Sequence, residues 1–165
     1  MAFKSQLYIP NKLEYINGSK RPNVDCIICA IAKKDPQVTN LLVGCNELVG
    51  CSVNLYPYNA GHVFLFPIRH VEDPRGLNSE EELEMAKMRN FAMDTLDKIY
   101  HPNGFNIGFN IGVASGASIK HLHQHIVPRY NRELGFVDVI GGTKIIIEDP
   151  LTTLEKLREA FKKYE

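Results

Sequence analysis

The segment from Ser79 to Ile99 carries the strongest structural signal in the chain, because its apolar residues recur at intervals of three and four. This spacing gathers them on one face of a helix. Ser79 and Glu82 also have the spacing of a capping box, which predicts that the helix begins with Ser79 as its cap. One face of a helix this long is therefore expected to be buried.

Short apolar runs of strand length lie on both sides of this helix. They fall at 41–43, 47–55, 62–67, 105–111, 119–128, 136–140 and 144–147. A short helix is expected over 26–33, and a C-terminal helix is expected where Asp149 can cap a first turn that starts with Pro150. Because strands and helices do not alternate regularly, we predict an α+β fold with a mostly antiparallel sheet.

The length of 165 residues suits a single domain over 1–165, with an N-terminal arm at 1–24 and a C-terminal extension at 130–165. Nineteen basic residues balance nineteen acidic ones, so no overall positive field attracts nucleic acid. No apolar run reaches the roughly 18 residues that span a membrane. The polar N-terminal stretch lacks the apolar core of a signal peptide, which predicts a cytoplasmic protein.

Three of the six histidines lie within five residues, at His121, His123 and His125. In a strand alternate side chains point to the same face, so a strand here would align all three. Imidazole can serve as a nucleophile, a hydrogen-bond donor or a metal ligand, and the residues alone leave these three uses open.

The loop 112–118 precedes the histidines and consists almost entirely of small residues. Small residues let a ligand approach the backbone, whose N–H groups can hold phosphate oxygens. An anion site beside a nucleophilic imidazole is what phosphoryl or nucleotidyl transfer requires.

The heptad HLHQHIV, His121 to Val127, resembles the signature of the histidine-triad (HIT) superfamily, in which three histidines alternate with hydrophobic residues. Residues 54–71 resemble the ribose-contacting hairpin of that family, and residues 104–125 resemble its phosphate loop and triad. Residues 136–146 are similar to an extension found in a branch close to the bacterial and archaeal diadenosine tetraphosphate phosphorylases. Gln124 departs from the signature, and its position in a strand turns it away from the triad.

The resemblance implies a role for each of four histidines. His123 resembles the nucleophile that takes up the nucleotide, and His121 resembles the residue whose backbone carbonyl fixes the tautomer of the nucleophile. His125 resembles the phosphate contact that helps the leaving group depart, and His62 the buried fourth histidine. The family positions that contact phosphate and ribose are filled here by Asn110, Gly116, Ser118 and Asn54.

The family further implies an enzyme that cleaves dinucleoside polyphosphates through a nucleotidyl-histidine at His123, and the branch resemblance favours diadenosine polyphosphate as the substrate class. Hydrolysis and phosphorolysis remain open, and so does the choice between adenine and guanine. Two rival functions also remain: cleavage of nucleoside phosphoramidates, and nucleotide binding without catalysis. The same family resemblance implies a homodimer, with the helix from Ser79 and the strand from Phe105 as contact elements.

Cys26 and Cys29 form a C-x-x-C pair, which is typical of a metal site or of a redox pair. The family resemblance adds His70 and His121 as the partners that would complete a structural zinc site. A catalytic metal held by the three clustered histidines is disfavoured, because no carboxylates accompany that segment. Cys45 and Cys51 are expected to be small residues of the core.

Overall fold

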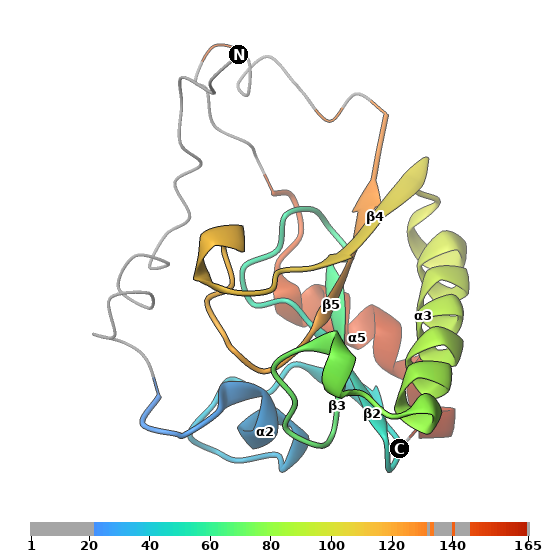
Figure 1. Ribbon diagram of the computed structural model, residues 1–165. Helices are drawn as coiled ribbons and strands as arrows, with labels where there is room; N and C mark the ends of the chain where they lie inside the picture. The colour runs from blue at the N-terminus through green and yellow to red at the C-terminus, as the bar shows by residue number, and fades with distance from the viewer. Residues whose placement is uncertain (1–21, 132, 134–139, 141–145, 165) are drawn as a thin grey trace.

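A computed structural model describes residues 22–131, 133, 140 and 146–164 (Figure 1). The α-helices and strands occur in the order α2 (Ile27–Ala32), β1 (Leu42–Cys45), β2 (Val49–Val53), β3 (Val63–Pro67), α3 (Ser79–Tyr100), β4 (Gly104–Phe109), β5 (Gln124–Arg129) and α5 (Pro150–Phe161). Two short 3₁₀ turns, η1 (Pro74–Gly76) and η2 (Val113–Ser115), lie in the connections between them, and a third, η3 (Lys162–Tyr164), follows α5. No helix of the described ranges is long and apolar enough to cross a membrane.

The five strands form one sheet in the order β1-β2-β3-β5-β4, and every neighbouring pair is antiparallel. The predicted α+β class and antiparallel sheet are therefore confirmed. Within the central pair, Val63 of β3 faces Ile126 of β5, and Phe64 faces His125. Because opposed residues share a face, this register separates an apolar face from the one that carries His125.

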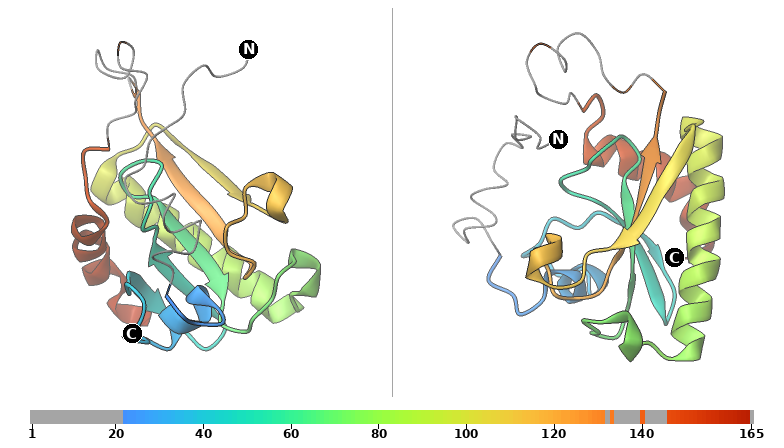
Figure 2. Two further views of the ribbon diagram at one scale, coloured as in Figure 1. Left: turned by 90° about the vertical axis from the view of Figure 1, so that its left-hand side faces the viewer. Right: turned by 45° about the horizontal axis from the view of Figure 1, so that its top comes forward.

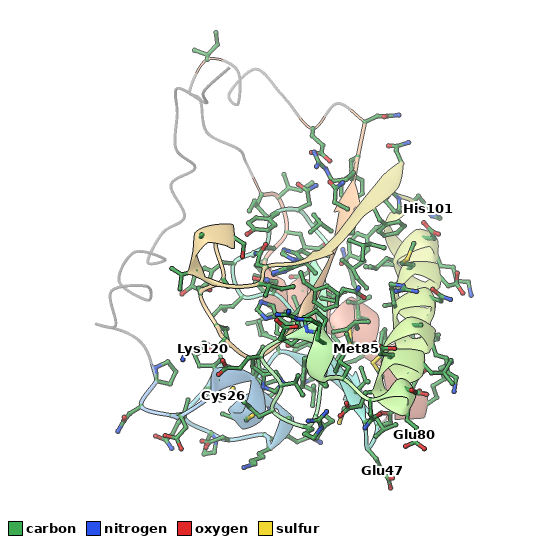
Figure 3. The ribbon with its side chains drawn as sticks, in the orientation of Figure 1. Cys26, Glu47, Glu80, Met85, His101 and Lys120 are labelled. Carbon is green, nitrogen blue, oxygen red and sulfur yellow. The ribbon has the colours of Figure 1, made fainter. Side chains whose placement is uncertain are left out.

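Helices α3 and α5 cover one face of the sheet, whereas α2 and the loop 112–118 lie on the other (Figure 2). Met88 of α3 and Leu65 of β3 belong to the larger apolar cluster, and both are fully buried. Burying a side chain of this size contributes about 1.5–3 kcal/mol. Figure 3 shows Met85 of α3 turned toward the sheet and Glu80 turned outward. The predicted buried face of this helix is thus confirmed.

The capping box of α3 lies one residue earlier than predicted. Asn78 is the N-cap: its side chain accepts from the backbone N–H of Glu81 at 2.9 Å, and the Glu81 carboxylate accepts from the backbone N–H of Asn78 at 2.9 Å. Glu81 is also held by the Arg69 guanidinium through two hydrogen bonds, at 2.7 and 2.9 Å. The Glu81 side chain is buried, and its ion pair with Arg69, which follows β3, favours Glu81 over Glu82 as the capping residue. The predicted pair Ser79 and Glu82 is therefore wrong.

The predicted strand 119–128 is too long at its start, since β5 begins only at Gln124. His121 and His123 precede the strand, and the backbone N–H of Leu122 bonds to the Val71 carbonyl at 2.7 Å instead of joining the sheet ladder. Gln124 faces Leu65 of the apolar cluster, as expected for a side chain turned away from His125. Its Oε1 atom is buried and has no hydrogen-bond partner among the described residues.

Several predicted segments lie outside the described residues. They are most of the N-terminal arm 1–24, part of the extension 130–165, most of the predicted strand 136–140 and half of the predicted strand 144–147. The C-terminal helix is observed where it was predicted, with Asp149 accepting hydrogen bonds from the backbone N–H groups of Leu151 and Thr152.

Candidate active site and metal centre

A cavity of about 450 Å³ opens on the face of the sheet that α2 covers. Six of the residues singled out in the sequence line it together: Asn54, Asn110, Gly116, Ser118, His123 and His125. His62 and His121 are buried and are not among its lining residues. Residues that are up to 71 positions apart, from Asn54 to His125, thus meet at one site.

The cavity also has an apolar wall, defined by Ile27, Ile31, Val38, Leu41 and Phe64. A flat aromatic base is well accommodated by such a surface. Sequence reasoning missed this wall, because α2 is brought to the cavity only by the tertiary fold. The pair Cys26 and Cys29 was the one local signal near it.

The protonation of His123 is fixed by its backbone environment. Its Nδ1 lies 2.8 Å from the carbonyl oxygen of His121. A carbonyl only accepts, so Nδ1 carries the proton and donates it, which leaves a lone pair on Nε2. Burial lowers the pKa of His123, against a smaller opposing effect of that hydrogen bond. The ring is therefore neutral at neutral pH and suited to nucleophilic attack.

A second chain of hydrogen bonds sets the tautomer of His125. The backbone N–H of Tyr58 donates to Nδ1 of His62 at 3.0 Å, so the proton of His62 must be on Nε2. That Nε2–H lies 3.0 Å from Nδ1 of His125 and donates to it. The proton of a neutral His125 is consequently on Nε2. The rings of His123 and His125 are 4.8 Å apart, one with a lone pair and one with a proton.

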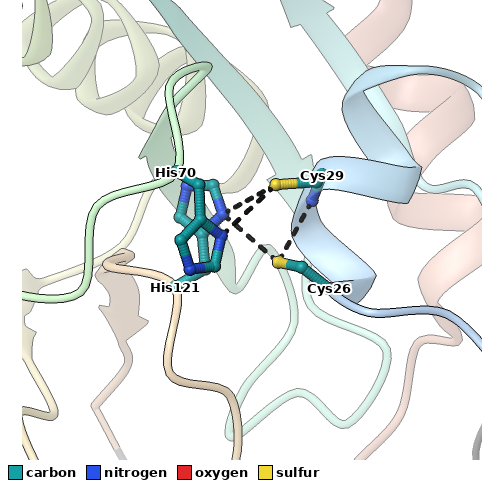
Figure 4. A group of neighbouring side chains, drawn as sticks. All are labelled: Cys26, Cys29, His70 and His121. Carbon is teal, nitrogen blue, oxygen red and sulfur yellow. Dashed lines mark hydrogen bonds between the residues drawn. The ribbon is translucent and has the colours of Figure 1, made fainter.

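Cys26, Cys29, His70 and His121 form a separate cluster whose ligand atoms all lie within 4.8 Å of one another (Figure 4). Nε2 of His121 donates to the Pro67 carbonyl at 2.9 Å, so the lone pair of its Nδ1 points to both sulfurs, each at 3.4 Å. Nδ1 of His70 also lies 3.4 Å from the Cys29 sulfur. Burial, then the hydrogen bond and charge of Cys26, raise the pKa of the Cys29 thiol to about 11.

This donor set fits a tetrahedral zinc ion. Zinc bonds of about 2.0–2.3 Å in a tetrahedron place neighbouring ligand atoms roughly 3.3–3.8 Å apart. The sulfur–nitrogen distances of 3.4 Å agree with that spacing. The four side chains come from α2, the segment after β3 and the segment before β5, so an ion would join three parts of the chain.

The amino-acid sequence also matches a known protein family. The family model of the HIT domain matches residues 35–132, which is more than half of the chain. The chain belongs to the HIT domain family. The predicted family membership and fold are confirmed.

Relatives in the HIT family include an AP-4-A phosphorylase of Mycobacterium tuberculosis, which is 32% identical over 148 residues, or 86% of this chain and 76% of the relative. The asymmetrical bis(5'-nucleosyl)-tetraphosphatase of Schizosaccharomyces pombe is 29% identical over 94 residues, or 57% of this chain and 52% of the relative. A zinc-bound histidine triad family protein from Mycobacterium smegmatis has a similar structure. Its TM-score is 0.68 and its identity 25%, over 84% of this chain and 94% of that one.

Without metal, this HIT protein is expected to lose stability as the pH is lowered from about 7 to about 5. Burial lowers the pKa of His121 from 6.5 to about 4, and burial lowers the pKa of His123 as well. In this range the unfolded chain binds more protons on these two histidines than the folded chain does, so the free energy of unfolding decreases as the pH is lowered. Urea unfolding with a chelator measures the difference, and His121→Asn should reduce it. Equal free energies of unfolding at the two pH values would contradict the prediction.

Proposed function

We propose that this HIT protein cleaves dinucleoside polyphosphates, with diadenosine tetraphosphate as the representative substrate, through a covalent nucleotidyl group on His123. The observation that carries the proposal is the hydrogen bonding of two adjacent rings: Nδ1 of His123 faces the His121 carbonyl, and Nδ1 of His125 faces Nε2 of His62. These contacts imply a lone pair on Nε2 of His123 and a proton on Nε2 of His125. The names of the two relatives described above support the substrate class.

The first step forms a bond between Nε2 of His123 and the α-phosphorus. The bond from that phosphorus to the bridging oxygen breaks, and the oxygen leaves with the electron pair, stabilised by the Nε2–H of His125. In the second step water or inorganic phosphate attacks the phosphorus. The P–N bond then breaks, and its electron pair returns to Nε2 of His123. Asn110, Gly116 and Ser118 would hold the phosphates.

The remaining cavity residues would bind the nucleoside. Asn54 lines the same cavity as the histidines and the apolar wall and would contact the ribose, while the wall would receive the base. The side-chain oxygen of Asn54 accepts from the backbone N–H of Tyr56 at 2.9 Å, which holds its amide in place. Asn54 can still donate through its NH₂ group.

Zinc is proposed as a structural ion held by Cys26, Cys29, His70 and His121. When bound, it supplies no reacting group, because four protein ligands close its coordination sphere. Its effect on the site would be to hold α2, which contributes Ile27 and Ile31 to the cavity wall.

Product analysis tests the proposed function. The protein is incubated with diadenosine tetraphosphate, with and without inorganic phosphate. ADP and ATP as products would show phosphorolysis, and AMP and ATP would show hydrolysis. Absence of turnover under both conditions, together with cleavage of adenosine phosphoramidate, would favour the rival phosphoramidate hydrolase. Nucleotide binding without any cleavage would leave a binding protein.

We also infer that the protein forms a homodimer through β4 and α3. Strand β4 is the last in the sheet order, so one of its edges has no strand beside it among the described residues. Ile107 on β4 is 40% exposed and Leu83 on α3 is 58% exposed. An exposed apolar edge strand is a template for pairing with another chain.

Sedimentation is expected to give twice the chain mass of 18.7 kDa at micromolar concentration. Ile107→Lys should shift the species toward monomer, because a charge on an edge strand opposes pairing. Leu151→Lys changes another exposed leucine, on α5, and serves as the control. A single wild-type species near 18.7 kDa would contradict the inference.

A further inference from the structure

A second groove, of about 480 Å³, adjoins the nucleotide cavity along β4 and β5. The two hollows share Tyr58, Asn110, Gly116 and His125, so they meet at the ring of His125. His123 lines the first hollow and is absent from the lining of the second. The groove therefore begins at His125 and extends beyond it, on the side that His123 does not reach.

This placement matches what an in-line displacement requires. The attacking atom and the leaving oxygen lie on opposite sides of the phosphorus. With His123 as the attacking residue, the leaving group must depart on the side of His125. We propose that the groove over β4 and β5 binds the leaving nucleotide of a dinucleoside polyphosphate, and that Gly108 keeps it open. The proposal rests on the proposed function.

The groove has the polar character that a nucleoside polyphosphate needs. Its lining includes the side chains of Asn59, Asn106, Ser115 and Arg129. The Arg129 guanidinium donates to Asn106 at 2.6 Å and is held by both oxygens of Glu133, yet its side chain remains 50% exposed. A guanidinium held in a fixed plane can stack on a base or bind phosphate oxygens. A leaving group as small as ammonia would use none of these contacts.

Gly108 lies directly opposite His125 in the ladder, and both residues line the groove. A Cβ atom built on Gly108 meets no atom within 4 Å. Since directly opposed residues share a face, a side chain at this position would stand in the groove next to His125. Packing among the described residues therefore does not require a glycine at this position.

Gly104 offers a matched control. It lies on the same strand, opposite Arg129, and a Cβ there also meets nothing within 4 Å. It is not among the residues that line the groove. A valine at 104 adds the same volume and the same strand preference as a valine at 108, but it stands beside Arg129, four ladder positions away from His125.

Binding is measured by calorimetry in the His123→Ala background, where no turnover consumes the ligand. AMP fills only the first cavity, whereas diadenosine tetraphosphate reaches into the groove. Gly108→Val is expected to weaken diadenosine tetraphosphate binding by about tenfold or more and to change AMP binding by less than about twofold. Gly108→Ala should give a smaller loss, and Gly104→Val should leave both affinities within about twofold.

The outcomes separate the two proposals. Unchanged diadenosine tetraphosphate binding by Gly108→Val and Gly108→Ala would overturn the groove assignment. Equal weakening of AMP and diadenosine tetraphosphate by Gly108→Ala would overturn it too, because the effect would then belong to the first cavity. Failure of the His123→Ala parent to bind either nucleotide would overturn the proposed function itself, before any substitution at Gly108 is considered.

Discussion

Replacing His123 by alanine is expected to lower turnover of diadenosine tetraphosphate by at least about a thousandfold while nucleotide affinity changes little. The reason is a division of tasks within the cavity. His123 would supply the covalent bond, whereas Asn54, Asn110 and the loop that contains Gly116 would supply ground-state binding. Loss of an interaction made only in the reaction step reduces kcat and spares KM.

Acid-labile labelling tests the same step directly. A phosphoramidate-linked nucleotide should be trapped on the wild-type protein and be absent from His123→Ala. His101→Asn is a suitable control, because His101 is an exposed C-cap of α3 with φ 47°, a conformation that asparagine accepts. Retention of more than roughly a few per cent of activity by His123→Ala would show that the covalent mechanism is wrong.

Local sequence signals placed some helix boundaries well and others poorly. Helix α5 begins where Asp149 and Pro150 predicted, because an N-cap followed by proline is a signal contained in adjacent residues. For α3, two overlapping pairs had capping-box spacing, and the observed one was decided by Arg69, which reaches Glu81 from the end of the β3 hairpin. The spacing of residues along the chain does not predict a tertiary contact such as that between Arg69 and Glu81.

In the candidate site, too, features set by neighbouring residues were predictable, whereas features set by the tertiary fold were not. The clustering of His123 and His125 at one cavity agrees with the sequence motif, since the residues are close neighbours in the chain. The expectation of a strand through His121 was wrong, because the His121 ring is held between the Pro67 carbonyl and the two cysteine sulfurs. The apolar wall from Ile27 and Ile31 was not predictable, since it depends on where α2 docks.

Removal of zinc is the second change with a large expected effect, on stability before activity. Helix α2 has only six residues, and a helix this short is not stable by itself. In the proposed site Cys26 caps this helix and Cys29 lies within it, while His70 and His121 belong to the body of the domain. The ion would therefore anchor α2, and its binding free energy would be folding free energy.

Protein purified without added metal should contain one zinc per chain by elemental analysis, and Cys26→Ser should abolish it. At free zinc of about a thousand times Kd the ion stabilises the fold by about 4 kcal/mol, which corresponds to a Tm shift of roughly 10 °C for a chain of this size. Cys45→Ser is the matched control, because Cys45 is partly buried and lies outside the cluster. Its zinc content should equal that of the wild type.

The activity of zinc-depleted protein follows from which residues α2 contributes. Ile27 and Ile31 line the apolar wall, whereas His123 and His125 are positioned by the His121 carbonyl and by His62. Loosening α2 should thus raise KM more than it lowers kcat, without altering the preference among substrates. A zinc content near zero, with Cys26 and Cys29 joined by a disulfide or freely alkylated in the folded protein, would reduce the C-x-x-C pair to a packing role. Because Ile27 and Ile31 would then hold α2 by apolar contact alone, a chelator would leave both Tm and KM unchanged.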